Sequence, residues 1–194
     1  QHQHQQHQLV QVEQQQKHPP AVPCLPGCNA SQSLAVLRAS KEAVTLIHGP
    51  PGSGKTHVIV ELLLQCLKPP STKKTSSAPI LVCAETHTAV DNVMCKLKCR
   101  GGPGFNLLRL GDLSSTRKDL QIDCLEAVPK VRSPEGNLDS RVVTRALSPA
   151  DAVFTTCAGA GSLVLSLSSR PFKMVVIDEA SQVTEPRTLL PLIH

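Results

Sequence analysis

Residues 49–56 constrain the fold of this chain more than any other segment. They read Gly49-Pro-Pro-Gly-Ser-Gly-Lys-Thr56 and match the pattern G-x-x-x-x-G-K-[ST] without a mismatch. An apolar run at 43–47 precedes them, and a long apolar stretch at 56–67 follows them. A strand, a glycine-rich turn and a helix in this order are typical of a phosphate-binding loop. A glycine-rich turn that matches by chance is the alternative, and the flanking segments argue against it.

The loop sequence predicts how its residues meet a nucleotide. Glycines let backbone N–H groups turn inward, and the N-terminus of the following helix adds a favourable dipole. Lys55 is expected to reach the β- and γ-phosphates, and the Thr56 hydroxyl is expected to bind Mg²⁺. The residues expected to contact the nucleotide are Gly49, Pro50, Pro51, Gly52, Ser53, Gly54, Lys55 and Thr56.

A pair of adjacent carboxylates supplies the second half of the predicted site. Met174-Val-Val-Ile-Asp-Glu179 is an apolar strand that ends in Asp178 and Glu179. At the carboxyl end of a parallel strand, Asp178 can bind Mg²⁺ beside the phosphate-binding loop. Glu179 can act as the general base for a water that attacks the γ-phosphate. An acidic pair without a catalytic role is the alternative. Together the two elements predict binding of a nucleoside triphosphate with Mg²⁺, and its hydrolysis.

Apolar strand-like segments alternate with helix-like segments along the chain. The expected strands are 43–47, 80–84, 105–110, 152–155 and 174–177. Three helices are expected: one that starts near Asn29, one at 56–67 and one at 88–99. Continuous apolar strands separated by helices indicate a parallel sheet covered by helices on both faces. The predicted fold class is therefore α/β, with the parallel sheet of a P-loop NTPase.

Composition divides the 194 residues into a tail and one domain. Residues 1–18 are rich in Gln and His, and 19–30 are rich in Pro, so neither segment can bury enough apolar surface to fold alone. We expect a disordered tail at 1–28 and one domain at 29–194, with a surface excursion at about 112–148. No apolar run approaches the ~20 residues that span a bilayer, so no membrane partner is expected.

Charge, aromatic content and cysteines narrow the function classes. The net charge of +5 indicates either a solvated basic face or attraction to polyanions. Only 2% of the residues are aromatic, which argues against a binding surface of stacked rings. Eight cysteines without a secretory signal indicate reduced thiols in an intracellular protein. Cys24/Cys28 and Cys95/Cys99 are C-x3-C pairs, but the pairs lie too far apart for us to expect zinc.

These elements together resemble superfamily 1 helicases, specifically the group that contains the nonsense-mediated decay, immunoglobulin mu-binding and senataxin-type helicases. The resemblance runs from about Asn29 to Leu192. The matching blocks are Asn29-Ala-Ser-Gln32 (the Q motif), Gly49 to Thr56 (motif I), Ile80 to Asn92 (motif Ia), Thr155 to Gly161 (the T-T-x-x-G-A-G segment) and Asp178 to Pro186 (motif II). In motif Ia, Glu85-Thr86-His87 replaces the Pro-Ser-Asn that is common in the group.

The resemblance implies a RecA-like domain and further site residues. Gln32 is implied to contact the adenine and select ATP, and Gln182 to couple the γ-phosphate site to a partner domain. The residues implied to contact the sugar–phosphate backbone of a single strand are Thr86, Thr88, Thr155 and Thr156. Caps at the ends of strands are the alternative role for these threonines. Backbone contacts do not distinguish RNA from DNA.

The resemblance also implies a longer protein. The family continues with a G-D-x-x-Q-L-P-P motif and a second RecA-like domain, whose arginines stabilise charge on the transferring phosphate. We therefore expect an incomplete first domain, cut after motif II, that binds ATP·Mg weakly and hydrolyses it little by itself. The whole protein is expected to be an ATP-dependent helicase that moves 5′ to 3′ on single-stranded RNA or DNA in the cytoplasm or nucleus.

Two other interpretations stay open at this point. The chain could be a non-motor nucleotide- or RNA-binding module, or another P-loop enzyme such as a small-molecule kinase. A kinase predicts no stimulation by nucleic acid. The Q motif and the Ala-Val-Asp-Asn block at 89–92 argue against a kinase.

Overall fold

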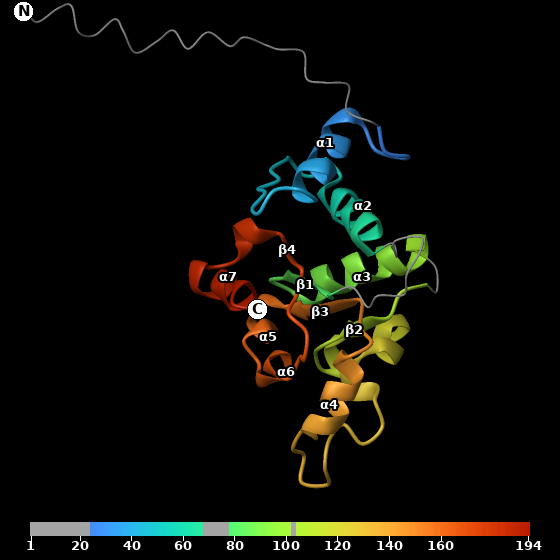
Figure 1. The fold of residues 1–194 in the computed structure, drawn as a ribbon, viewed down its shortest axis with the longest axis vertical. Coiled ribbons are helices and arrows are strands. Elements are labelled where there is room, and N and C mark those ends of the chain that lie inside the picture. Colours follow the sequence, from blue (N-terminus) through green and yellow to red (C-terminus); the bar gives the residue numbers. More distant parts are fainter. Residues whose placement is uncertain (1–23, 68–77, 102–103) are drawn as a thin grey trace, which may run out of the picture.

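A four-stranded parallel sheet forms the centre of the molecule (Figure 1). The computed structural model describes residues 24–67, 78–101 and 104–194. The strands are β1 (Ile80–Ala84), β2 (Leu107–Arg109), β3 (Ala152–Thr156) and β4 (Met174–Asp178), in the order β2-β3-β1-β4. Ala84 pairs with Thr156 on one side and with Asp178 on the other, so three strands end at one edge. The predicted parallel α/β fold is confirmed.

Helices follow the strands in sequence, as the alternation predicted. They are α1 (Ala30–Ala39), α2 (Lys55–Leu67), α3 (His87–Gly101), α4 (Ser140–Leu147), α5 (Cys157–Ala160), α6 (Leu163–Ser166) and α7 (Glu185–Leu192). The expected excursion at 112–148 contains α4 and three short 3-10 helices: η2 (Leu113–Ser115), η3 (Lys118–Asp123) and η4 (Leu125–Ala127). A further 3-10 turn, η5 (Ala180–Gln182), follows β4.

The two faces of the sheet are covered by different helices. On one face, Val82 and Phe154 pack with Val60 and Leu63 of α2 and with residues of α3. On the other face, residues of β1 and β3 pack with α4, α5 and α6. In Figure 1 these two groups of helices lie on opposite sides of the strands. Alternating side chains of each strand therefore enter two separate hydrophobic cores.

The strand predicted at 43–47 is wrong. The segment has no regular secondary structure, and Val44 and Leu46 are 78% and 92% exposed. A strand needs a neighbour to bond its N–H and C=O groups, and residues 43–47 pair with no strand in the described part of the chain. Apolar composition alone was not enough to form a strand here.

Two expectations concern the ends and the surface of the fold. Most of the tail predicted at 1–28 lies outside the described residues, which begin at Cys24. The helix expected to start at Asn29 is α1, whose N-cap is Asn29. In the described ranges, no helix is both long and apolar enough to cross a membrane.

Candidate nucleotide-binding site

The loop before α2 has the backbone geometry of a phosphate cradle. Gly52 and Gly54 have φ values of 78° and 86°, which L residues with side chains rarely adopt. The Ser53 N–H donates to the Pro50 carbonyl at 3.2 Å and closes a turn. The N–H groups of Gly54, Lys55 and Thr56 donate to no other group among the described residues. The loop therefore offers several N–H groups to an anion at the N-terminus of α2.

Lys55 already lies folded over this loop. Its ammonium donates to the Gly49 carbonyl at 2.7 Å and to the Pro50 carbonyl at 3.0 Å. The positive charge therefore lies at the first residues of the loop whose last residues present the free N–H groups. A chain of N–H groups with one ammonium fits the phosphates of a nucleotide.

Gln32 contacts the phosphate-binding loop, although the two lie far apart in the sequence. Its Nε2 donates to the Ser53 carbonyl at 3.1 Å, and its Oε1 accepts from the Asn29 N–H at 3.0 Å. A Cβ added at Gly54 would lie 2.6 Å from this Nε2, so the close approach requires glycine. The capping box that starts α1 thus positions Gln32 at the loop. Its contact with adenine stays a prediction.

Asp178 and Glu179 lie at the carboxyl end of β4, as predicted. Asp178 is 7% exposed, and its Oδ1 accepts from the Glu179 N–H at 2.9 Å. Glu179 is exposed and lies in the left-handed region (φ 53°, ψ 34°), which costs a residue with a side chain roughly 1–2 kcal/mol. Such strain is common at functional sites. Glu179 therefore combines a left-handed backbone with a solvent-exposed side chain directly after the strand.

The two halves of the predicted site are joined through packing. Val58 and Leu62 of α2 pack with Met174 and Val176 of β4. Within the described ranges, no hydrogen bond or ion pair connects the loop at 49–56 with Asp178, Glu179 or Gln182. Gln182 is exposed, and its N–H donates to the Glu179 carbonyl at 2.8 Å. The hydroxyl of Thr56 and the carboxylate of Asp178 are oxygen ligands of the type that Mg²⁺ prefers.

The four threonines differ in exposure. Thr86 and Thr88 are exposed at the start of α3, and Thr86 Oγ1 accepts from the Ala89 N–H at 3.2 Å. Thr155 and Thr156 are only 1% and 8% exposed. Thr156 caps α5 because its Oγ1 accepts from the Gly159 N–H at 3.0 Å. Capping is therefore present for Thr86 and Thr156, and binding of a nucleic acid by all four stays a prediction.

A buried charged network beside motif Ia is the main feature that sequence reasoning missed. Arg109 is fully buried, and its Nε donates to Asp91 Oδ1 at 2.8 Å. The other oxygen of Asp91 accepts from the Arg117 N–H at 2.8 Å, and Arg109 Nη2 donates to His87 Nδ1 at 3.0 Å. An arginine within the apolar run at 105–110 was the available signal. His87, which departs from the family pattern, is thus a partner of this network.

A second charged contact joins motif Ia to α7. Glu85, directly after β1, forms an ion pair with Arg187.

The buried thiol of Cys157 lies near this ion pair. Burial raises the pKa of the Cys157 thiol to about 11, and the charge of Glu85 adds to the effect. Cys157 is therefore a protonated, buried thiol at neutral pH and no nucleophile.

This fold, with its glycine-rich loop, lysine and paired carboxylates, defines a P-loop NTPase domain of the RecA-like type. The family model for the AAA domain matches residues 27–133 and 114–194. The chain belongs to this family, and within it to the superfamily 1 helicases of the nonsense-mediated decay and senataxin-like group.

Three curated relatives illustrate the similarity. The chain is 31% identical to the ATP-dependent helicase upf1 of Schizosaccharomyces pombe over 89% of its own length. It is 30% identical to the DNA polymerase alpha-associated DNA helicase A of the same species over 85%. It is 32% identical to the DNA replication ATP-dependent helicase/nuclease DNA2 of Saccharomyces cerevisiae over 84%. The chain spans only 21%, 29% and 10% of these relatives, respectively.

Proposed function

We propose that this chain is the ATP-binding lobe of an ATP-dependent helicase that moves along single-stranded RNA or DNA in the cytoplasm or nucleus. The observation that carries the proposal is the loop at 49–56, which holds both the Lys55 ammonium and N–H groups without a partner among the described residues. Similarity to proteins that are named as helicases supports the proposal.

Each residue has a distinct role in the proposed reaction. Lys55 and the loop N–H groups bind the β- and γ-phosphates, and Gln32 contacts the adenine and selects ATP. Thr56 and Asp178 hold Mg²⁺, which neutralises charge on the phosphate oxygens when it is bound. Glu179 orients the attacking water and accepts its proton. Gln182, at the surface after Glu179, relays the state of the site to a second RecA-like domain.

The proposed path of the nucleic acid runs past the ends of β1 and β3. Thr86 and Thr88 are exposed there and can donate hydroxyl protons to phosphates. Thr155 and Thr156 lie at the adjacent strand end, and we propose that they complete the contact. Such contacts hold the backbone and read no bases, which suits binding without sequence preference.

ATP hydrolysis by a protein that contains this lobe and its second RecA-like domain tests the proposal. Glu179→Gln should leave ATP binding intact and lower the hydrolysis rate by at least ~100-fold, because the general base is lost. Glu42→Gln, which changes an exposed carboxylate before the loop, is the matched control and should hydrolyse normally. Normal hydrolysis by Glu179→Gln would show that Glu179 is not the base.

The same protein separates the other two interpretations. A helicase motor should hydrolyse ATP faster when single-stranded RNA or DNA is added. A non-motor binding module would bind the nucleotide or RNA without hydrolysing ATP. A small-molecule kinase would transfer phosphate to its substrate and ignore nucleic acid. By contrast, the isolated chain should bind ATP·Mg weakly and show little turnover, because arginines from the second domain contribute a factor of ~10³–10⁵ in related enzymes.

A further inference from the structure

Three metal-ligating side chains meet beside the N-terminal half of α2. Cys28 lies in the turn before α1, and His57 and Glu61 lie one turn apart on α2. One ligand atom from each residue lies within 4.8 Å of the other two. Cys28 and His57 are half-buried, and Glu61 is buried. Two segments separated by the whole phosphate-binding loop thus converge on one point.

The spacing of these atoms is that of ligands around one ion. Cys28 Sγ lies 3.4 Å from His57 Nε2. A tetrahedral zinc ion with Zn–S of ~2.3 Å and Zn–N of ~2.0–2.1 Å holds its sulfur and nitrogen ligands about 3.6 Å apart. Residues i and i+4 of a helix project from the same face, so His57 and Glu61 can reach one ion together.

We propose that Cys28, His57 and Glu61 bind one zinc-type divalent cation, with water in the fourth position. A thiolate, an imidazole and a carboxylate are the ligand types that zinc prefers. One thiolate and one carboxylate also balance the two positive charges of the ion. This set differs from the two C-x3-C pairs in the sequence, since only Cys28 belongs to both.

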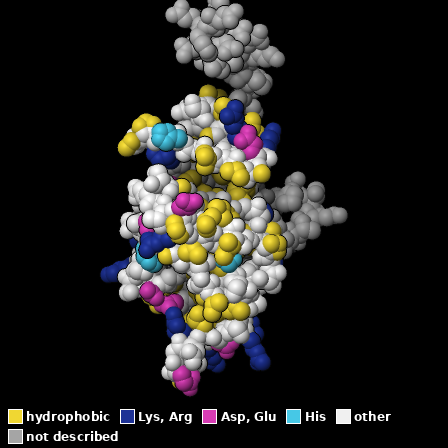
Figure 2. Space-filling model, turned by 90° about the vertical axis from the view of Figure 1, so that its left-hand side faces the viewer, with side chains coloured by type: hydrophobic (Ala, Val, Ile, Leu, Met, Phe, Trp, Pro, Cys, Tyr) yellow, Lys and Arg dark blue, Asp and Glu magenta, His cyan; other side chains and the backbone are white. Residues whose placement is uncertain are grey.

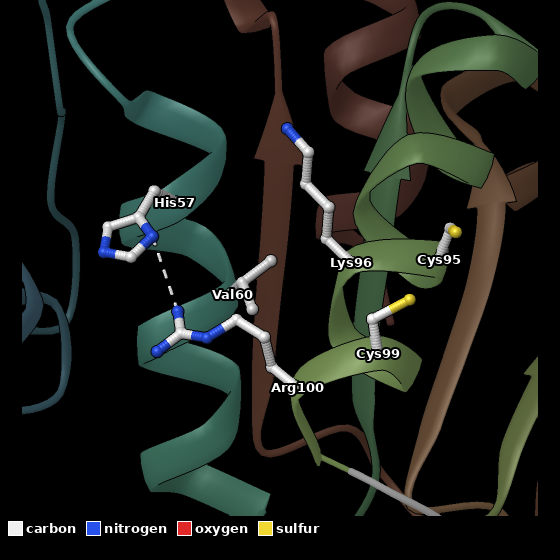
Figure 3. Close-up of a pocket in the computed structure, with 6 residues that line it drawn as sticks. All are labelled: His57, Val60, Cys95, Lys96, Cys99 and Arg100. Atoms are coloured by element: carbon white, nitrogen blue, oxygen red, sulfur yellow. Dashed lines mark hydrogen bonds between the residues drawn. The ribbon is translucent and has the colours of Figure 1, made fainter. Parts of the chain in front are cut away.

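Arg100 competes with the ion for the same groups. Its Nη2 donates to Glu61 Oε2 at 2.7 Å, and its Nη1 lies 3.4 Å from His57 Nδ1 (Figure 3). The Arg100 side chain is 37% exposed and can turn into solvent when the ion binds. His57 Nε2, which lies 2.9 Å from the Gly27 carbonyl, exchanges that contact for the metal.

The other thiols near this point are excluded by direction. Cys95 and Cys99 line the same pocket as His57 and Arg100. Figure 3 shows that their sulfur atoms turn away from His57, whereas the guanidinium of Arg100 reaches it. Cys99 is therefore a nearby thiol that should not bind the ion.

A bound ion would fix the chain before α1 to the helix after the phosphate-binding loop. Cys28 directly precedes the capping box that orients Gln32, and His57 directly follows Thr56. The ion would therefore hold Gln32 against the loop by a link that does not involve the nucleotide. Metal binding and nucleotide binding can accordingly be measured independently.

Cobalt titration of the reduced, metal-free 194-residue chain tests the site. Co²⁺ bound to a thiolate in a tetrahedral site absorbs strongly through sulfur-to-metal charge transfer and ligand-field bands. We expect both features to saturate at one equivalent and to disappear when Zn²⁺ is added. The four histidines of residues 1–18 can also bind Co²⁺, but they contain no sulfur and give no charge-transfer band.

Four single substitutions test the thiolate ligand and the competition by Arg100. Cys28→Ser should abolish the charge-transfer band, whereas the matched controls Cys24→Ser and Cys99→Ser should keep it. Arg100→Ala should tighten cobalt binding about two- to fivefold, because the buried Glu61 no longer has to give up its ion pair with the partly exposed Arg100 when the metal binds. Circular dichroism confirms that each variant is folded.

Three results would overturn the proposal. They are the absence of a charge-transfer band at saturating Co²⁺, a band that survives Cys28→Ser, and weaker cobalt binding by Arg100→Ala. If Cys28→Ser fails to fold, Glu61→Gln replaces it and should lower the cobalt affinity while the band per bound ion is kept. An unchanged affinity in that variant would also contradict the assignment.

Discussion

β1 and β4 are paired strands of equal length, yet they have different surroundings. All five residues of β1 are buried, whereas Met174 to Ile177 of β4 are only partly buried. β1 lies between β3 and β4, whereas among the described residues β4 pairs on one side only. The difference shows that strand position, more than strand sequence, decides burial here. The predicted catalytic carboxylates follow the less buried of the two strands.

Burial also differs between regions outside the sheet. Hydrophobic side chains gather on the face of the molecule that carries the 43–50 segment and α7 (Figure 2). The exposed ones in these segments are Val44, Leu46, Ile47, Leu189, Leu192 and Ile193. On the β2–β3 side, by contrast, even Arg109 is fully buried. Apolar side chains of the 43–50 segment and α7 are therefore exposed, whereas Arg109 and Asp91 of the charged network are buried.

Breaking the buried network should have the largest effect on stability. Arg109→Ala leaves the Asp91 charge buried without its partner, so the free energy of unfolding should fall by about 3–5 kcal/mol. Urea denaturation of the full chain measures this change. Arg117→Ala removes an exposed ion pair with Asp119 and should change stability little. A small effect of Arg109→Ala would show that the ion pair between Arg109 and Asp91 contributes little to the stability of the fold.

One matched pair of truncations tests the difference between the strands directly. Val82 of β1 and Val176 of β4 are paired in register. Val82→Ala opens a cavity in a closed core and should cost about 2–3 kcal/mol, whereas Val176→Ala should cost about 1 kcal/mol or less. Urea denaturation compares the two. Equal losses would contradict the contrast between the strands.

Relief of backbone strain should give a smaller, opposite effect. Glu179→Gly removes a side chain from the left-handed region and should raise the free energy of unfolding by roughly 0.5–1 kcal/mol, the strain relieved less the flexibility that glycine adds to the unfolded chain. Lys130→Gly, at the other left-handed residue with a side chain in the described part of the chain (φ 62°), should stabilise the fold similarly. Only Glu179→Gly should lower ATP hydrolysis in the two-domain protein. Destabilisation by both variants would show that neither backbone is strained.

The sequence predicted the parts of the fold that depend on local pattern. The runs at 80–84 and 152–155 became buried strands, and Asn29 and Gln32 formed the cap of α1. The 43–47 run has the same apolar character but no strand beside it, so its pattern could not show that it stays exposed. Long-range pairing, which a local pattern does not contain, decided the outcome there.

The candidate site also contains some features that the local sequence predicts and others that it does not. The turn at 49–56 and the strand end at Asp178 follow from local sequence and were predicted correctly in position. The contact between Gln32 and Ser53 and the ion pair between Asp91 and Arg109 join distant segments. Only the folded chain shows such contacts, since nothing in the sequence near either partner specifies the other.

Binding of ATP·Mg by the full chain tests the central claim most directly. Isothermal titration should compare the unchanged protein with Lys55→Ala and with the control Lys41→Ala, which removes an exposed lysine before the loop. Lys55→Ala should weaken binding by at least about tenfold, because a hydrogen bond between charged groups contributes ~1.5–3 kcal/mol, and Lys41→Ala should bind normally. Equal affinities for all three proteins would contradict the assignment of residues 49–56 as the nucleotide site.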